Sequence, residues 1–214
     1  MNHINQQQIR SIVFDLDGTL YVSDELAASI KFAATGYLAT ITGKDAAETA
    51  SMMAEEKRRL MEESEAPATL SAVCHHMGGT IQAMHAYFEK HLKPESCLVR
   101  DMRVIELLNG LKQCFSLYIY TNNNRVLATR IIDYLGLGGM FRNVFTIDDN
   151  WRPKPDETRL EQIFSICGHA PAEILFVGDR YDVDLRLPEQ YGCPVFLAQN
   201  IEQLLRLQKL LSKS

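Results

Sequence analysis

Paired cysteines and long apolar runs are both missing from this sequence of 214 residues. Its five cysteines are scattered singly and form no C-x-x-C pair, which argues against a zinc ribbon, a thioredoxin-type site and a disulfide scaffold. Such cysteines are typical of a reducing compartment. No apolar run approaches the roughly 20 residues of a membrane span, and the polar N-terminus does not read as a signal peptide. We therefore expect a cytoplasmic protein with no membrane partner.

Positive charge is also in short supply. The chain has 22 Lys and Arg residues against 27 Asp and Glu residues, so its formal net charge is 22 − 27 = −5. Without a broad positive field it has little attraction for phosphate backbones, and we expect no nucleic-acid partner. Apolar residues make up 46% and charged residues 23%, as in ordinary globular proteins. The length allows one large domain or a core with an insertion, and it leaves the oligomeric state open.

Short apolar runs alternate with helical patterns over most of the chain. Strands are predicted at Ile9–Phe14, Leu117–Tyr120, Ile174–Val177 and Pro194–Leu197, with a weaker run at Val144–Ile147. Helices are predicted at 102–113, 126–135, 156–167, 182–191 and 201–211. Nearly continuous apolar strands separated by helices are typical of a parallel sheet. The prediction is an α/β fold with a Rossmann-like parallel-sheet core and helices on both faces.

The segment 21–97 has a different character. It contains no convincing strand and is rich in Ala, Glu and Met, which favour helices. Apolar residues such as Leu26, Ala33 and Tyr37 recur at helical spacing. We expect three or four helices here, forming an all-helical domain over 21–97. This domain would be inserted into an α/β core made of 1–20 and 98–214.

Two acidic residues follow the first predicted strand. Asp15 and Asp17 leave the strand end on the same side, because side chains alternate along an extended chain. Carboxylates this close repel one another unless a cation or a shared proton intervenes. Mg²⁺ resolves such repulsion and prefers hard oxygen ligands. Asp17-Gly18 is also a common turn signal, but a turn does not explain the acidic residue that ends a buried run.

Two further segments, one with neutral polar residues and one with a lysine, also lie near predicted strands. Thr121 and Asn122 directly follow Leu117–Tyr120 and suit a phosphate oxygen, although Thr and Asn are also common helix N-caps. Lys154 stands between two prolines, which restrict where its side chain can point. A fixed ammonium group could offset clustered negative charge, although most loop lysines are plain surface residues.

A second acidic segment follows the strand Ile174–Val177. It contains Asp179, Asp182 and Asp184, which would repel one another in the absence of a cation. The alternative is that these acids stabilise a helix N-terminus through its dipole. Because ligands of open parallel sheets bind at the carboxyl ends of the strands, the placement favours a metal site.

In this order and placement, the four segments resemble the motifs of the haloacid dehalogenase superfamily of phosphohydrolases. The resemblance covers 12–20 and the chain from about residue 98 onward, and the helical segment stands where this family carries a cap after its first motif. It implies a Mg²⁺-dependent phosphatase that hydrolyses a small phosphorylated metabolite, bound between core and cap. The opening 15–21 is also similar to that of the pyrimidine-nucleotidase-like branch.

The resemblance implies catalytic roles as well. Asp15 matches the nucleophile that forms an aspartyl-phosphate, and Asp17 matches the general acid/base. Thr121 matches the phosphate-binding hydroxyl, with Asn122 beside it. Lys154 matches the lysine that orients the nucleophile and screens phosphate charge.

The same resemblance implies a set of Mg²⁺ ligands. Asp15 and Asp179 match carboxylate ligands, and Asp17 matches a ligand that uses its backbone carbonyl. The second acid of the last motif has variable spacing in the family, so Asp184 is the first choice and Asp182 the second.

Two alternative functions share these features. A phosphomutase would use the same core residues and return the phosphoryl group to its substrate. A non-enzymatic module would bind a phospho-ligand or a partner protein without turnover, but pure binding needs no acid/base at Asp17. True dehalogenases of the superfamily generally lack an acid at this position, so Asp17 favours phosphoryl chemistry.

Overall fold

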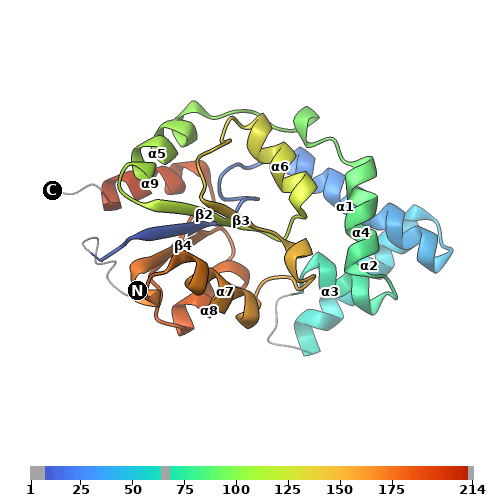
Figure 1. Ribbon diagram of the computed structural model, residues 1–214. Coiled ribbons are helices and arrows are strands. Elements are labelled where there is room, and N and C mark those ends of the chain that lie inside the picture. Colours follow the sequence, from blue (N-terminus) through green and yellow to red (C-terminus); the bar gives the residue numbers. More distant parts are fainter. Residues whose placement is uncertain (1–7, 64–67, 212–214) are drawn as a thin grey trace. The chain divides into compact units, whose positions relative to one another are not determined.

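The computed structural model describes residues 8–63 and 68–211 (Figure 1). Residues 1–7, where we expect no signal peptide, lie outside the described residues, as do 64–67 and 212–214. The chain divides into two compact units, one formed by 1–22 with 98–214 and the other by 23–97. Within the described residues, the sheet belongs to the first unit and the second unit is helical.

Five parallel strands form the sheet within the described part of the chain. In spatial order they are β3 (Asn143–Phe145), β2 (Ser116–Tyr120), β1 (Ser11–Phe14), β4 (Ile174–Gly178) and β5 (Val195–Leu197). The central strand β1 pairs with a neighbour on each side, so that Ser11 lies opposite both Ser116 and Ile174. All residues of β1 are buried, as expected for a central parallel strand.

Helices cover both faces of this sheet (Figure 1). Alternate strand residues point to opposite faces, and Val13, Tyr118 and Phe176 pack on one face against Leu160 and Ile163. That face carries α7 (Glu157–Cys167) and α8 (Arg186–Gln190), the other carries α5 (Met102–Lys112) and α9 (Ile201–Leu211), and α6 (Arg125–Tyr134) connects β2 to β3. The predicted α/β fold with a covered parallel sheet is confirmed.

The predicted helix over 182–191 is only half right. The chain forms a π-helical turn at Tyr181–Leu185 before α8 begins at Arg186. In this wide turn the Asp184 carboxylate accepts a hydrogen bond from the Arg180 N–H at 3.1 Å. Arg180 is the residue before the turn, so its N–H has no acceptor within the turn and the Asp184 carboxylate satisfies it.

The helical unit begins and ends at two hydrogen-bonded residues. The Ser23 hydroxyl donates to the Cys97 carbonyl at 2.7 Å and accepts from the Leu26 N–H at 3.1 Å, so it also caps the first helix. The helices are α1 (Asp24–Thr42), α2 (Ala46–Glu63), α3 (Leu70–His76) and α4 (Ile81–His91), followed by a 3₁₀ turn at Pro94–Ser96. Predicted interior residues Leu26, Ala33 and Tyr37 are buried.

Two expectations from composition concern the whole chain. All five cysteines are free, in agreement with their scattered placement. Across 8–63 and 68–211, none of the helices combines the length and the apolar character that crossing a membrane requires.

The packing of α9 gives a first prediction. Leu207 is fully buried, at 0% exposure, whereas Leu210 on the same helix is half-buried. We expect Leu207→Ala to lower the free energy of unfolding by about 2–4 kcal/mol, because it leaves a cavity that the core fills only partly. Leu210→Ala makes the same chemical change and should cost clearly less. Urea denaturation of both variants tests this, and equal losses would contradict the packing described.

Candidate active site

The predicted site residues lie in the first unit, at the carboxyl edge of its sheet. Asp15 directly follows β1, Thr121 follows β2 and Asp179 follows β4. Backbone hydrogen bonds continue the sheet ladder into these loops, from Asp15 N–H to the Val177 carbonyl at 2.8 Å and from Thr121 N–H to the Phe145 carbonyl at 2.9 Å. The sheet therefore fixes the start of the loops that follow β1 and β2.

Lys154 joins the two acidic segments. Its ammonium nitrogen lies 2.5 Å from Asp15 Oδ1 and 2.6 Å from Asp184 Oδ1, and it donates a third hydrogen bond to the Tyr120 carbonyl at 3.0 Å. All three N–H groups of the ammonium are therefore used. The side chain is only 1% exposed, and a buried cation of this kind is tolerated only when it is fully paired.

Burial and crowding shift the protonation of these groups. Burial raises the pKa of Asp15 to about 7 against the lowering effect of Lys154, and Asp184 and Asp17 act in the same direction as burial. Burial opposes the charge of Lys154, but Asp15 and Asp184 outweigh it and raise the pKa of the ammonium above its usual value. Burial, with Asp184, also raises the pKa of Asp179. The single positive charge of the Lys154 ammonium thus does not balance the negative charge of these carboxylates.

Asp17 is held by a separate set of hydrogen bonds. The Tyr21 hydroxyl donates to its Oδ1, while Asn123 Nδ2 and the Thr121 hydroxyl donate to its Oδ2 at 2.7 Å and 3.2 Å. Three donors from two loops fix the orientation of this carboxylate. The proton of the Thr121 hydroxyl is used by Asp17 in this arrangement.

The remaining acids form a group suited to a metal ion. Asp15, Asp179 and Asp184 each offer a carboxylate oxygen, and these oxygens lie within 4.8 Å of one another. Asp179 Oδ1 is buried and accepts no hydrogen bond from any residue that the structure describes, although Arg180 Nε lies 3.7 Å away. Hard oxygen ligands with excess negative charge are what Mg²⁺ prefers. Asp182, by contrast, is 69% exposed and faces Arg186.

Two glycines make room for these acids. At Gly18, which has a φ of +86°, a Cβ would lie 2.5 Å from Asp179 Oδ2. At Gly178 a Cβ would lie 2.5 Å from Asp184 Cβ. Both approaches are far below ordinary van der Waals contact, so the absence of a side chain lets the two acidic segments come together.

Residues 9–192 match the model of the haloacid dehalogenase-like hydrolase family. The chain belongs to this family. It is 28% identical over 182 residues to the pyrophosphatase PpaX of Bacillus velezensis, a match covering 83% of this chain and 78% of that protein. The family membership expected from the motifs is confirmed.

Solved structures of this family share the fold. A HAD phosphatase from Thermococcus onnurineus superposes with a TM-score of 0.66 at 17% identity, covering 95% of this chain and 98% of that chain. The putative HAD-hydrolase YfnB from Bacillus subtilis, bound to magnesium, gives 0.63 at 18% identity and covers 96% and 100%. These relatives give no support to the pyrimidine-nucleotidase-like branch.

The structure adds residues to this HAD-like site that the motif analysis missed. Tyr21 and Asn123 contact Asp17, and the Thr19 hydroxyl donates to Asp15 Oδ2 at 3.2 Å. Asn122 does not face the carboxylates, because its Oδ1 accepts the backbone N–H of Lys154 at 2.8 Å. Side-chain alternation beyond β2 would have grouped Asn123 with Thr121.

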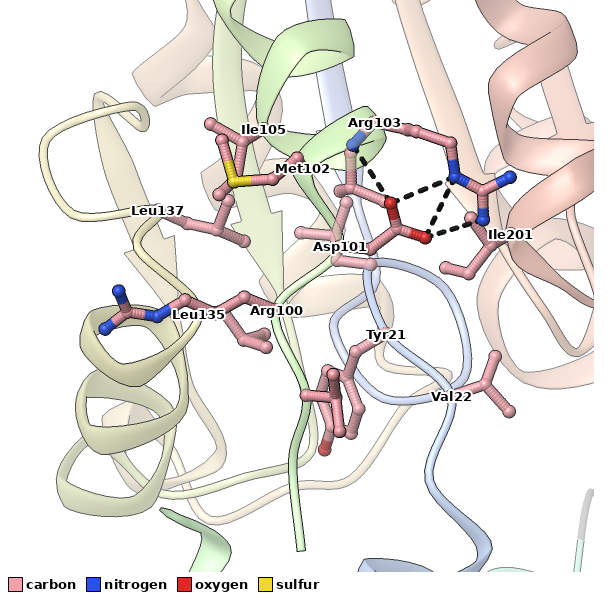
Figure 2. A pocket seen from close by; sticks show the side chains of 13 residues that line it. Tyr21, Val22, Arg100, Asp101, Met102, Arg103, Ile105, Leu135, Leu137 and Ile201 are labelled. Carbon is pink, nitrogen blue, oxygen red and sulfur yellow. Dashed lines mark hydrogen bonds and ion pairs between the residues drawn. The ribbon is translucent and has the colours of Figure 1, made fainter.

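Tyr21 also lines a hollow of about 420 Å³ in the first unit (Figure 2). Its walls include Arg100, Met102 and Leu137, and its Asp101 carboxylate binds Arg103. Of the site residues described, Tyr21 is the one that also belongs to this lining, so the acidic group and the hollow are separate features.

Close packing at Gly178 predicts the effect of adding one methyl group. Gly178→Ala should lower the free energy of unfolding by about 1–3 kcal/mol, because the new Cβ overlaps Asp184. Gly110 in α5 is a matched control, since a Cβ there meets no described atom within 4 Å. Gly110→Ala should raise stability by roughly 0.5–1 kcal/mol. Denaturant unfolding measures both, and a neutral Gly178→Ala would refute the close approach.

Proposed function

We propose that this HAD-like hydrolase is a Mg²⁺-dependent phosphatase that acts on a small phosphorylated molecule through a phosphorylated Asp15. The observation that carries the proposal is the convergence of Asp15, Lys154 and Asp184 at one sheet edge, with Asp17 fixed nearby by its own donors. Lys154 holds one oxygen of Asp15 and Thr19 holds the other, so the carboxylate has a defined orientation. Preorganisation of this kind lowers the cost of reaching the transition state.

In the first step an Asp15 oxygen forms a bond to the phosphorus of the substrate. The bond between phosphorus and the leaving oxygen breaks, and Asp17 in its protonated form gives its proton to that oxygen. Lys154 contributes a fixed positive charge where the phosphoryl group carries negative charge. The products of this step are the released alcohol or phosphate and a phosphorylated Asp15.

In the second step Asp17, now a carboxylate, takes a proton from water. The water oxygen attacks phosphorus, the bond to Asp15 breaks, and inorganic phosphate leaves. Tyr21 and Asn123 orient Asp17 for both proton transfers, because each donates to one of its two oxygens.

The acidic group supports the metal requirement. Asp15, Asp179 and Asp184, together with the backbone carbonyl of Asp17, would hold Mg²⁺. When bound, Mg²⁺ offsets the negative charge of the carboxylates and of the transferring phosphoryl group. Binding of magnesium by YfnB supports the same choice of ion here.

The relatives suggest which substrate to test first. Two relatives, from Bacillus velezensis and Halalkalibacterium halodurans, are both named pyrophosphatase PpaX, at 28% and 25% identity. Inorganic pyrophosphate is therefore the leading candidate, with phosphate monoesters as the alternative class.

Phosphate release tests this function directly. With Mg²⁺ present, the protein should release phosphate from pyrophosphate or from one member of a monoester panel, and chelation of the metal should stop it. Asp15→Asn should lower kcat by roughly 10³-fold or more, because it removes the nucleophile. Asp182→Asn, which removes an exposed acid of the same segment, should stay near the unsubstituted rate.

The outcomes separate the alternatives. Full activity in Asp15→Asn would exclude the nucleophile assignment. Transfer of phosphate between positions of one substrate, without release, would indicate a phosphomutase. Binding of the panel without turnover would indicate a binding module.

The role of Asp17 gives a further prediction. Asp17→Asn should lower kcat by about 10²–10⁴-fold, because the leaving oxygen and the water lose their proton donor and acceptor. Binding of inorganic phosphate, measured by calorimetry, should change little. An unaltered kcat would show that another group carries the proton.

A further inference from the structure

A second hollow lies at the opposite edge of the same sheet. It has a volume of about 280 Å³, and its lining includes Arg10, Ser116, Arg142 and His169. Arg10 directly precedes β1, Ser116 begins β2 and Arg142 directly precedes β3, so the hollow sits at the amino ends of these strands. From Arg10 to Asp15 the chain runs along β1 for five residues, about 16 Å of extended chain.

The charge of this hollow is unusual for an acidic protein. Its lining carries the cations Arg10, Lys112 and Arg142 and contains neither Asp nor Glu. Eight other arginines have a carboxylate oxygen within 4.0 Å: Arg58, Arg59, Arg103, Arg125, Arg152, Arg159, Arg180 and Arg186. Within 8–63 and 68–211, neither Arg10 nor Arg142 has such a partner.

The backbone that carries these cations is fixed. The Ser116 N–H donates to the Arg10 carbonyl at 3.0 Å, and the Arg142 N–H donates to the Leu117 carbonyl at 2.8 Å. The two arginines therefore flank β2 from both sides, each about 4.8 Å away in the hydrogen-bonding direction. The Lys112 ammonium is held by the Gly139 carbonyl at 2.7 Å, which leaves two of its three N–H groups for a ligand.

His169 adds a fourth group that can meet an anion. Its Nδ1 lies 2.8 Å from the Ser11 hydroxyl, so the ring is attached to the first residue of β1. Its Nε2 has no hydrogen bond to any residue in the described ranges and can donate to a bound oxygen.

We propose that this hollow, which we call the basic pocket, binds the phosphate group of a small anionic molecule. Two arginines line this hollow, and charge-assisted hydrogen bonds from guanidinium groups to phosphate oxygens are strong. An adjoining hollow of about 160 Å³ shares Lys112 and Arg142 and adds Met140 and Phe141. It gives an apolar surface to the rest of the molecule.

The basic pocket is a binding site and not a second active site. Its lining contains no carboxylate to act as nucleophile or base. Phosphate binding in the basic pocket therefore does not depend on a catalytic role of Asp15.

Inorganic phosphate is the probe that tests the pocket, by amide chemical shifts of the isotope-labelled full chain without Mg²⁺. We expect saturable shifts at Ser116, Arg142 and His169. Arg142→Glu should weaken this binding tenfold or more, because it replaces a charge-assisted donor by a repelling carboxylate. Arg206→Glu is the matched control, since Arg206 is exposed on α9 and outside the lining; its affinity should change less than twofold.

The shifts also show what would overturn the proposal. Shifts confined to the loops of Asp15, Thr121 and Asp179 would mean that phosphate binds only at the acidic edge. Equal weakening by Arg142→Glu and Arg206→Glu would mean attraction by net charge alone. The spectrum of each variant reports its folding, and if Arg142→Glu fails to fold, Arg142→Gln must show the loss of affinity for the proposal to stand.

Discussion

The buried ammonium of Lys154 is the interaction on which the arrangement of the acidic edge depends. Asp15 and Asp184 come from loops that follow different strands, and the same nitrogen binds both. Without a cation between them, two buried carboxylates would pay a desolvation cost and repel each other. Asn122 holds the backbone of Lys154, so the loop after β2 fixes the lysine that joins the loops after β1 and β4.

This pairing places Asp15 and Asp17 in different surroundings. The carboxylates of Asp15 and Asp184 are tied to Lys154, whereas Asp17 is tied only to neutral donors, Tyr21, Thr121 and Asn123. Two acids that are two residues apart in the sequence thus occupy different electrostatic surroundings. Different surroundings allow neighbouring carboxyl groups to take different roles, as the proposed mechanism requires of Asp15 as nucleophile and Asp17 as proton carrier.

Most of the core could be predicted from the sequence, because parallel strands buried on both faces leave continuous apolar runs such as Ile174–Val177. Strand placement also predicted that Asp15 and Asp179 lie at one edge of the sheet, whereas the role of Lys154 was implied by the family resemblance. The partners of Asp17 were harder to predict, since Tyr21 and Asn123 depend on how two loops fold back. The wide turn at Tyr181–Leu185 was missed because a single π-helical turn at the start of a helix leaves no periodic signal of its own.

The bond between Ser23 and Cys97 has a consequence for how this chain is built. The first and last residues of the helical unit are within hydrogen-bond distance. The 75-residue segment 23–97 is therefore a closed insertion whose two ends are adjacent. Insertions with adjacent ends disturb a host fold little. The α/β unit can therefore carry an inserted segment of different length or chemistry in this place, while β1 and β2 keep their register.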